Sequence, residues 1–376
     1  MDRPHVLLFH DSYMDYVTCL ANALAERLPV TVLHSSHMHD WMPGLSDAVR
    51  TAVYPYRRMR DPRRLRHLPV VADVAASVGA DLVHFQQSVD PWFNLTQLRG
   101  RHRLPDVMTV HDVAPHPGDR TTVPGGHLTL RTQRRAMDRF IVHSAPLRLD
   151  LVRRWRIRAE KVDVVPHGEL GRLYRRLAGR RTGADATSGR QRRPGNVLFF
   201  GRVWPYKGLD RLVQAMNLLA ETRPGLVLTI AGEGHGLDAY RRAVRPPLAV
   251  RVLDRYVEQN EVSELFAEAD VVCLPYLEAS QSGVHALACG LGVPVVASAV
   301  GGLASAVRDG CDGLLVPPGD VAALAAALAR VLDDPALRVR LASGATARAV
   351  GDLDWGTIAD TTLEVYARAR GAFGPA

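Results

Sequence analysis

Lysine is almost absent from this chain of 376 residues. Lys and Arg together number 47, but only Lys161 and Lys207 are lysine. Cysteine is scarce too, and its four positions follow no metal-binding or redox spacing. No apolar run approaches the length of a membrane helix, and the N-terminus has no signal-peptide pattern. We therefore expect a cytoplasmic protein without disulfides or a membrane span.

The net charge of +8 is unevenly distributed along the chain. Residues 1–194 carry 31 Lys and Arg against 19 Asp and Glu, or +12, and the remainder carries 16 against 20, or −4. A basic half joined to a mildly acidic half predicts two domains, which the chain length also favours. Nucleic-acid binding would rest on the basic balance alone, because no binding motif of that kind is present.

Short apolar runs alternate with helical patterns in both halves, which predicts an α/β protein with parallel sheets. The runs lie at 5–9, 30–33, 80–85, 106–110, 139–142, 161–165, 196–200, 226–231, 250–253, 271–274, 293–297 and 314–316. The expected organisation is a domain at 1–170, a linker without apolar periodicity at 171–195, a domain at 196–350, and a helix at 351–376 that could return to the first domain.

The segment Gly201-Arg-Val-Trp-Pro-Tyr-Lys-Gly208 follows one of these runs and precedes a helical pattern. Arg202 offers a planar fork and Lys207 a compact charge, and both suit a diphosphate. Ligands of open α/β sheets bind at the carboxyl ends of the strands, where this segment begins. A solvated basic turn is the alternative interpretation.

A second strand end carries complementary groups. The turn Gln281-Ser-Gly-Val284 offers free backbone N–H groups at a helix start, which suits an anion. Glu278, just before it, can accept hydrogen bonds from sugar hydroxyls, although a plain surface acid is an equally good reading of Glu278 alone. The glycine-rich turn at 232–236 is a weak signal by itself. Cations, amides and one carboxylate together favour a sugar attached to a diphosphate.

The second half resembles the nucleotide-sugar domain of glycosyltransferase family 4, which comprises retaining enzymes of the GT-B fold. Five matching segments stand in the family's order, at 201–208, 231–234, 268–275, 292–302 and 309–317. The segment Pro275-Tyr-Leu-Glu-Ala-Ser-Gln-Ser-Gly-Val284 is similar to one branch of that family. The first half is similar more loosely, through 109–115 and 165–168. The resemblance implies two doubly wound Rossmann-like domains that face a central crevice.

The resemblance further implies a hexosyltransferase that uses a UDP- or GDP-linked sugar and a hydroxyl acceptor, retains the anomeric configuration, and needs no metal or other cofactor. The acceptor could be a saccharide, a lipid-linked precursor or a natural product. The expected catalytic residues are Arg202, Lys207, Glu278 and His111. The residues expected to bind the nucleotide sugar are Gly201, Gly234, Arg255, Tyr256, Ser282, Gly283 and Val284. Asp15 and Tyr16 are expected on the acceptor side. His111 follows a predicted strand and could equally be structural.

The chain departs from the family in two places. The family has a second glutamate, eight positions after the first, that binds the ribose, and Ala286 stands there. The family's glycine-rich first loop is replaced by His10-Asp-Ser-Tyr-Met-Asp-Tyr16. Two alternatives therefore stay open: a catalytically altered relative that binds nucleotide without cleaving the sugar, and a nucleotide-sugar 2-epimerase of the same fold.

Two basic clusters in the first half have no assigned role. The cluster Tyr54–Arg66 could bind an anionic membrane surface or a phosphorylated acceptor, which would make the protein peripheral at the inner membrane face. A solvated helix face is the simpler interpretation in a chain so rich in arginine. The cluster Arg131–Arg135 is less specific still.

Overall fold

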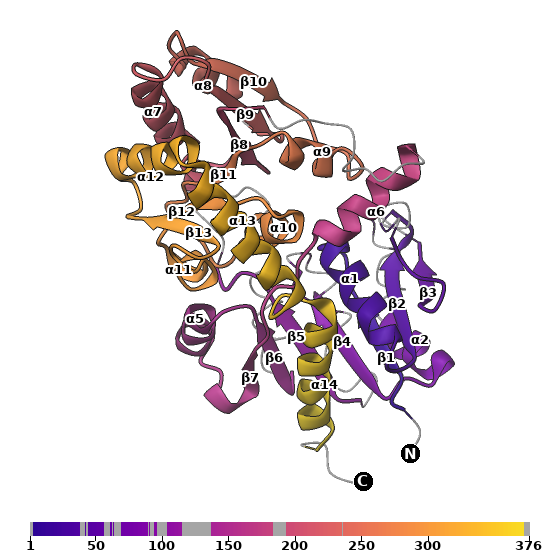
Figure 1. The fold of residues 1–376 in the computed structure, drawn as a ribbon. Coiled ribbons are helices and arrows are strands. Elements are labelled where there is room, and N and C mark those ends of the chain that lie inside the picture. The colour runs from indigo at the N-terminus through magenta and orange to yellow at the C-terminus, as the bar shows by residue number, and fades with distance from the viewer. Residues whose placement is uncertain are drawn as a thin grey trace. The chain divides into compact units, whose positions relative to one another are not determined.

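The computed structural model describes residues 3–37, 42, 44–55, 61, 63, 69–88, 90, 94–95, 104–114, 137–182, 193–234 and 236–371, with the backbone alone at 180–182. These residues form two compact units (Figure 1). The first unit holds the described residues up to Gly168 together with those from Trp355 onward, and the second holds Glu169–Asp354. The chain therefore passes twice from one unit to the other.

The first unit is a parallel sheet of seven strands in the order β3-β2-β1-β4-β5-β6-β7. Its strands are β1 (Val6–Phe9), β2 (Val30–Ser35), β3 (Arg50–Tyr54), β4 (Leu82–Gln86), β5 (Asp106–Val110), β6 (Arg139–Val142) and β7 (Val162–Val164). The described helices of this unit are α1 (Met14–Ala25), α2 (Val70–Val78), α5 (Ala145–Trp155) and α14 (Trp355–Gly371), with a 3-10 turn η3 (Ala159–Lys161).

The second unit is a parallel sheet of six strands in the order β10-β9-β8-β11-β12-β13. Its strands are β8 (Asn196–Phe200), β9 (Val227–Ala231), β10 (Ala249–Leu253), β11 (Val271–Leu274), β12 (Val295–Ser298) and β13 (Gly313–Val316). Its helices are α6 (Gly171–Thr182), α7 (Leu209–Ala220), α8 (Leu237–Ala243), α9 (Val262–Ala267), α10 (Gly283–Leu291), α11 (Gly301–Ala306), α12 (Val321–Asp333) and α13 (Pro335–Val350), with a 3-10 turn η4 (Pro205–Lys207).

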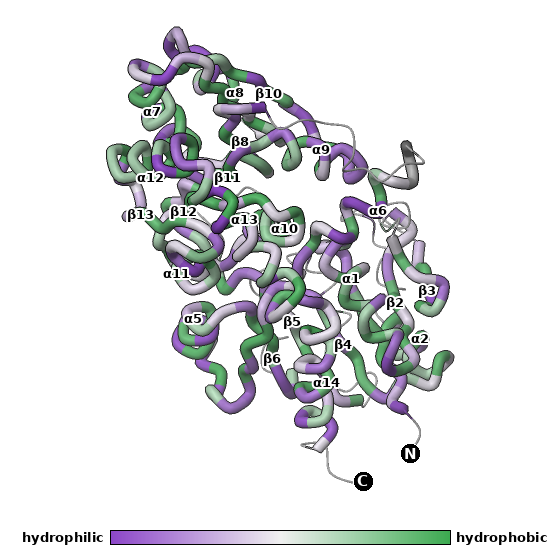
Figure 2. Tube along the Cα trace, viewed as in Figure 1, coloured by the Kyte–Doolittle hydropathy of each residue, from purple (hydrophilic) through white to green (hydrophobic). Residues whose placement is uncertain are grey.

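Both sheets are covered by helices, and this is why their strands read as continuous apolar runs. Every residue of β1, β4 and β5 is buried, and so is every residue of β11 and β12. Accordingly, hydrophobic residues lie along the strands β5 and β6 in Figure 2. Each unit has its own cluster of buried aliphatic and aromatic side chains.

The strand order of each unit reverses direction at one point, between β1 and β4 in the first and between β8 and β11 in the second. Open parallel sheets bind ligands at this switch, outside the carboxyl ends of the strands. In the second unit the two segments singled out in the sequence, 201–208 and 275–284, follow β8 and β11 directly. The fold therefore brings both segments to the switch point.

Three features differ from the sequence-based expectations or refine them. The expected linker begins with helix α6, which buries Leu173, Tyr174, Leu177 and Ala178. Strand β3 was not expected, and it is a half-exposed edge strand. The C-terminal helix α14 belongs to the first unit, where it packs against α1.

Candidate functional site

Glycines bring the loops after β8 and β9 into direct backbone contact. Val203 and Gly234 form an isolated parallel bridge beyond the two strands. A Cβ on Gly234 would lie 2.5 Å from Val203 Cβ, and a Cβ on Gly232 would lie 2.3 Å from Gly201 O. Real Cβ atoms do not approach that closely, so only glycine fits. Gly232 and Gly234 therefore support the loop that carries Arg202.

Lys207 ends the 3-10 turn η4 and its ammonium lies back over the loop. A Cβ on Gly201, which has a φ of +103°, would lie 3.1 Å from Lys207 Nζ. The same Nζ lies 5.3 Å from the centroid of the Tyr276 ring, within cation–π range. Gly208 follows with a φ of +65°, and a Cβ there would lie 2.0 Å from Pro275 O. The turn therefore packs directly against the loop that follows β11, and the Tyr276 ring of that loop supports the Lys207 ammonium.

The start of α10 contributes backbone amides beside Lys207. Ser282 caps this helix, because its side chain accepts a hydrogen bond from His285 N at 3.3 Å. Tyr276 is buried, which raises its pKa, and it forms a hydrogen bond with the same Ser282. Val284 Cγ2 lies 3.7 Å from the Cβ position of Gly201, so the helix start and the Lys207 loop are adjacent. A cation and a helix N-terminus side by side suit a diphosphate.

Glu278 lies on an exposed loop that rests on the start of α11. Gly302 N donates to Ala279 O at 3.0 Å, and a Cβ on Gly301 would lie 1.8 Å from that same oxygen. The Gly301-Gly302 pair therefore holds the Glu278 loop in place by allowing this contact. The glycine pair is thus a structural support for the loop.

The positions expected to contact the nucleoside differ in burial and in their partners. Ala286, where the family has its ribose glutamate, is a buried alanine of α10. Its neighbour His285 is also buried, and His285 Nε2 lies 3.5 Å from Cys289 Sγ of the same helix. Neither position supplies a carboxylate in place of the family's glutamate. Arg255 is bound in a fork by Glu261, at 2.7 and 2.9 Å, and Tyr256 is exposed.

In the first unit, Tyr16 lies inside the protein instead of on the surface. It is 3% exposed, and its ring contacts those of His111, His143, His167 and Trp355 at centroid distances of 5.1–5.3 Å. Asp15 is in the first turn of α1. The residue that covers His111 is Tyr13, which the sequence did not single out: its ring stacks on His111 at 3.7 Å.

Tyr13 reaches this position through an unusual backbone conformation. Its φ of 61° and ψ of 40° are left-handed, a region that tyrosine rarely adopts, and it lies at the start of α1. The family's glycine-rich loop is missing at this point. A residue with a large ring thus takes a backbone conformation in which glycine would be unstrained.

The three histidines around Tyr16 are uncharged at neutral pH. Burial lowers the pKa of His143 to about 3 and that of His167 to about 4. Burial and the neighbouring histidines lower the pKa of His111 well below its ordinary value. Such a cluster can exchange hydrogen bonds with a neutral ligand, and it carries no charge for an anionic one.

A second polar group at the same sheet edge was also missed. Asp11 follows β1, and its carboxylate accepts hydrogen bonds from Ser88 at 2.5 Å and from Ser12 at 3.0 Å. Burial raises the pKa of Asp11 to about 6. Its place directly after the first strand was the one available signal, because carboxyl ends of parallel strands collect polar residues.

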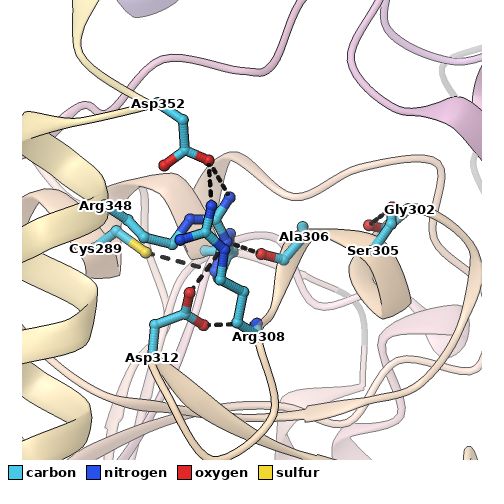
Figure 3. Close-up of polar contacts among 9 residues, drawn as sticks. Cys289, Gly302, Ser305, Ala306, Arg308, Asp312, Arg348 and Asp352 are labelled. Carbon is cyan, nitrogen blue, oxygen red and sulfur yellow. Dashed lines mark hydrogen bonds and ion pairs between the residues drawn. The ribbon is translucent and has the colours of Figure 1, made fainter.

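One Asp-x-Asp pair occurs in the chain, Asp352-Leu-Asp354, and both carboxylates are bound by arginines. Asp352 and the buried Asp312 pair with Arg348 at 3.1 Å each, and Arg308 also reaches Asp352 at 3.0 Å (Figure 3). Asp354 pairs with Arg172 at 2.7 Å. Arg348 also donates to Ala306 O. This network joins α13 to the loop before β13, and its carboxylates have a structural role.

Some expectations fall outside the described residues. Of the basic cluster Tyr54–Arg66, only positions 54, 55, 61 and 63 are described, and the cluster Arg131–Arg135 lies wholly outside. Within the described part of the chain, no group of three or more His, Cys, Asp or Glu side chains is arranged to hold a metal ion. The described helices also include none with the length and apolar character needed to cross a membrane.

The comparisons with known proteins identify the family. The description "Glycosyltransferase Family 4" matches residues 15–168, and "Glycosyl transferases group 1" matches 194–334. A D-inositol 3-phosphate glycosyltransferase of Frankia alni is 33% identical over 293 residues, which cover 73% of this chain and 70% of that protein. The chain therefore belongs to glycosyltransferase family 4.

Other relatives match over shorter stretches. Glycogen synthase of Mycobacterium tuberculosis is 39% identical over 180 residues, which are 47% of this chain and 43% of that protein. A D-inositol 3-phosphate glycosyltransferase of Salinispora arenicola is 35% identical over 253 residues, which are 63% of this chain and 56% of that protein. This chain thus spans about half the length of these two relatives.

Solved structures confirm the GT-B fold expected from the sequence. Sucrose-phosphate synthase from Thermosynechococcus elongatus superimposes with a TM-score of 0.73 at 22% identity, over 98% of this chain and 100% of that one. The Anabaena protein Alr3699/HepE, solved with UDP and glucose, gives 0.72 at 19% identity, over 97% and 100%.

Proposed function

We propose that the protein transfers a hexose from a nucleoside-diphosphate sugar to a hydroxyl acceptor, with retention of configuration and without a metal ion. One observation carries this proposal: Lys207 Nζ lies against Gly201 and the Tyr276 ring, next to the amide-bearing start of α10, at the switch point of the second sheet. Family membership and the UDP and glucose bound by the structural neighbour Alr3699/HepE support it.

The chemistry follows from where negative charge develops. As the bond between the anomeric carbon and the diphosphate breaks, the leaving group gains charge. Lys207, the exposed Arg202 and the amides of Gly283 and Val284 are donors that can stabilise it, and such preorganised donors lower barriers by several kcal/mol each. Glu278, exposed on its loop, would accept hydrogen bonds from donor-sugar hydroxyls.

The first unit would bind the acceptor, with Asp15 at the start of α1, and His111 would contact a hydroxyl of the donor sugar. A peripheral contact with anionic lipid is also part of the proposal, and it would rest on the arginines of the cluster Tyr54–Arg66. Flotation with vesicles of phosphatidylglycerol and phosphatidylcholine tests it, because a chain that stays in the soluble fraction at low salt has no such contact.

Titration of UDP, GDP, ADP and dTDP by calorimetry in EDTA tests the diphosphate site. We expect one nucleotide to bind, and Lys207→Ala to weaken it about ten- to hundredfold, since hydrogen bonds to charged groups contribute roughly 1.5–3 kcal/mol. Lys161→Ala is a matched control, because it removes the same charge from the first unit, where Lys161 Nζ donates to Met137 O. Equal affinity in wild type and Lys207→Ala would refute the site.

The buried Ala286 favours one alternative, a relative that binds nucleotide but cleaves no sugar. Incubation with UDP-glucose or GDP-mannose and a panel of sugar acceptors separates the two. Transfer to a new glycoside of unchanged anomeric configuration, undiminished by EDTA, supports the proposal. Nucleotide binding without turnover supports the alternative, and consumption of donor without any acceptor supports an epimerase.

A further inference from the structure

Two polar side chains meet at the switch point of the first sheet. Strands β1 and β4 are neighbours at this switch, and their carboxyl ends lie at the same edge. Asp11 follows β1 and Ser88 follows β4. Ser88 Oγ lies 2.5 Å from Asp11 Oδ2, so one hydrogen bond joins the two loops. The first unit therefore presents a carboxylate at the place where open parallel sheets bind ligands.

The hydrogen bonds around Asp11 hold its carboxylate in place and leave room for one more donor. An ionised carboxylate only accepts, so the hydroxyl protons of Ser88 and Ser12 point to Asp11. Asp90 N donates to Ser88 Oγ at 3.0 Å and fixes that hydroxyl. The backbone N–H of Asp11 itself is a third donor. A carboxylate has about four acceptor sites, and the described contacts leave one of them open to a ligand.

The carboxylate is within reach of solvent. Asp11 is partly exposed, in contrast to Ser88 and His10, which are 4% and 0% exposed. His10 is also uncharged at neutral pH, because burial lowers its pKa to about 3. The charged group that acts on Asp11 is Asp90, which has the same sign. A ligand that approaches Asp11 thus meets a negative charge that no neighbouring cation neutralises among the described residues.

The charge of Asp11 does not stabilise the fold. Burial raises the pKa of Asp11 from 3.8 to about 6, although the hydrogen bond from Ser88 lowers it, and the like charge of Asp90 adds to the rise. Because the pKa is higher in the folded state, an ionised Asp11 costs stability at neutral pH. Ionisable groups kept at such a cost are typical of functional sites.

We propose that Asp11 binds the acceptor by accepting a hydrogen bond from one of its hydroxyl groups, and that Ser88 is a positioning residue that orients the carboxylate. The one open acceptor site matches one hydroxyl donor. The charge of Asp11 repels a phosphate or carboxylate at this point, so the group bound here belongs to a neutral sugar or polyol. This inference rests on the proposed function, which assigns the acceptor to the first unit.

Asp11→Asn separates a binding role from a structural one, because the two roles predict opposite changes in stability. The variant keeps the shape of the side chain and removes its charge. Above pH 6, where wild type is ionised, Asp11→Asn should have a higher urea midpoint than wild type. The difference should shrink as the pH falls toward 3.8, because wild type then becomes neutral as well. A lower midpoint than wild type at pH 8 would show a structural role and overturn the proposal.

Acceptor kinetics test the contact itself. With UDP-glucose or GDP-mannose as donor, wild type is assayed against glucose, mannose, maltose and myo-inositol. Asp11→Asn should raise the acceptor KM about tenfold and leave the donor KM unchanged, as expected for one weakened hydrogen bond to a charged group. Asp73→Asn is the matched control, since it removes the same charge from an exposed position of α2. An unchanged acceptor KM in Asp11→Asn, or an equal rise in the donor KM, would contradict the contact.

The pH profile tests the positioning role of Ser88. The acceptor kcat/KM of wild type should fall below about pH 6, as Asp11 takes up a proton. Ser88→Ala removes a hydrogen bond that lowers the pKa of Asp11, so the fall should begin at a higher pH and activity should recover in alkaline buffer. An identical profile in Ser88→Ala would refute the positioning role.

Binding without turnover distinguishes this inference from the proposed function. If wild type transfers to none of these sugars, the proposed function fails, and urea midpoints in the presence of each sugar decide the role of Asp11. A sugar that raises the midpoint of wild type but not that of Asp11→Asn supports the contact. No rise with any sugar overturns it.

Discussion

Replacing Tyr276 should separate two contributions to diphosphate binding. Its ring lies under the Lys207 ammonium at 5.3 Å, and its hydroxyl bonds to Ser282, the cap of α10. A buried cation–π contact contributes about 1–2 kcal/mol, which corresponds to roughly five- to thirtyfold in affinity. A neutral hydrogen bond contributes about 1 kcal/mol, or roughly fivefold. Tyr276→Phe removes only the second contribution, and Tyr276→Leu removes both.

The discriminating assay compares a nucleoside diphosphate with its monophosphate by calorimetry. Because Lys207 is proposed to act on the diphosphate, Tyr276→Leu should weaken UDP or GDP binding by up to about a hundredfold and UMP or GMP binding far less. Tyr276→Phe should lose about fivefold. Circular dichroism confirms that each variant is folded at the assay temperature. Equal losses for diphosphate and monophosphate in Tyr276→Leu would refute the reasoning, because they would indicate general damage to the loop.

Two further predictions concern stability. Gly208→Ala should destabilise the protein in urea more than Gly225→Ala does. Both glycines have a positive φ, which costs alanine about 1–2 kcal/mol. A Cβ on Gly208 would also lie 2.0 Å from Pro275 O, whereas a Cβ on Gly225 would have no atom within 4 Å. Equal urea midpoints would show that the loop yields to the methyl group. His84 bonds Tyr366 at 2.7 Å and Thr109 at 2.8 Å, and burial lowers its pKa to about 3. The unfolded chain therefore takes up the proton first, so stability should be full above pH 6.5 and fall as the pH drops toward 3. His84→Gln should reduce the slope of urea midpoint against pH, and an identical slope would contradict the assignment.

Much of the second unit could be predicted from the sequence because its central strands, such as β11 and β12, are buried on both faces. Each strand reads as an apolar run, and the polar segments that follow are those that the fold collects at one sheet edge. The family resemblance predicted the GT-B fold correctly because its motifs lie in these polar segments after the strands. The glycines were harder to interpret: the turn at 232–236 gave only a weak signal, and Gly232 and Gly301 permit backbone contacts between segments far apart in the chain.

The wrong or missing predictions concern segments whose structure depends on tertiary contacts. Helix α6 was expected to be a linker because its arginines obscure the apolar stripe of Leu173, Tyr174 and Leu177, which is visible once that stripe is buried. Strand β3 is half exposed and carries too few apolar residues to stand out. Tyr13 could not be foreseen, because its contact with His111 depends on a left-handed backbone that sequence patterns disfavour for tyrosine.

The return of α14 to the first unit determines how this protein can be divided. A fragment that stops at Gly168 would lack residues 355–371, and His84 would lose the Tyr366 hydroxyl that it bonds in the core. The face of α1 that packs against α14 would be open to water, and Arg27 would lose its ion pair with Asp360. Separate production of the first unit therefore calls for a fusion that joins residue 168 to residue 355 through a short linker. The second unit, by contrast, can be cut out as one continuous stretch.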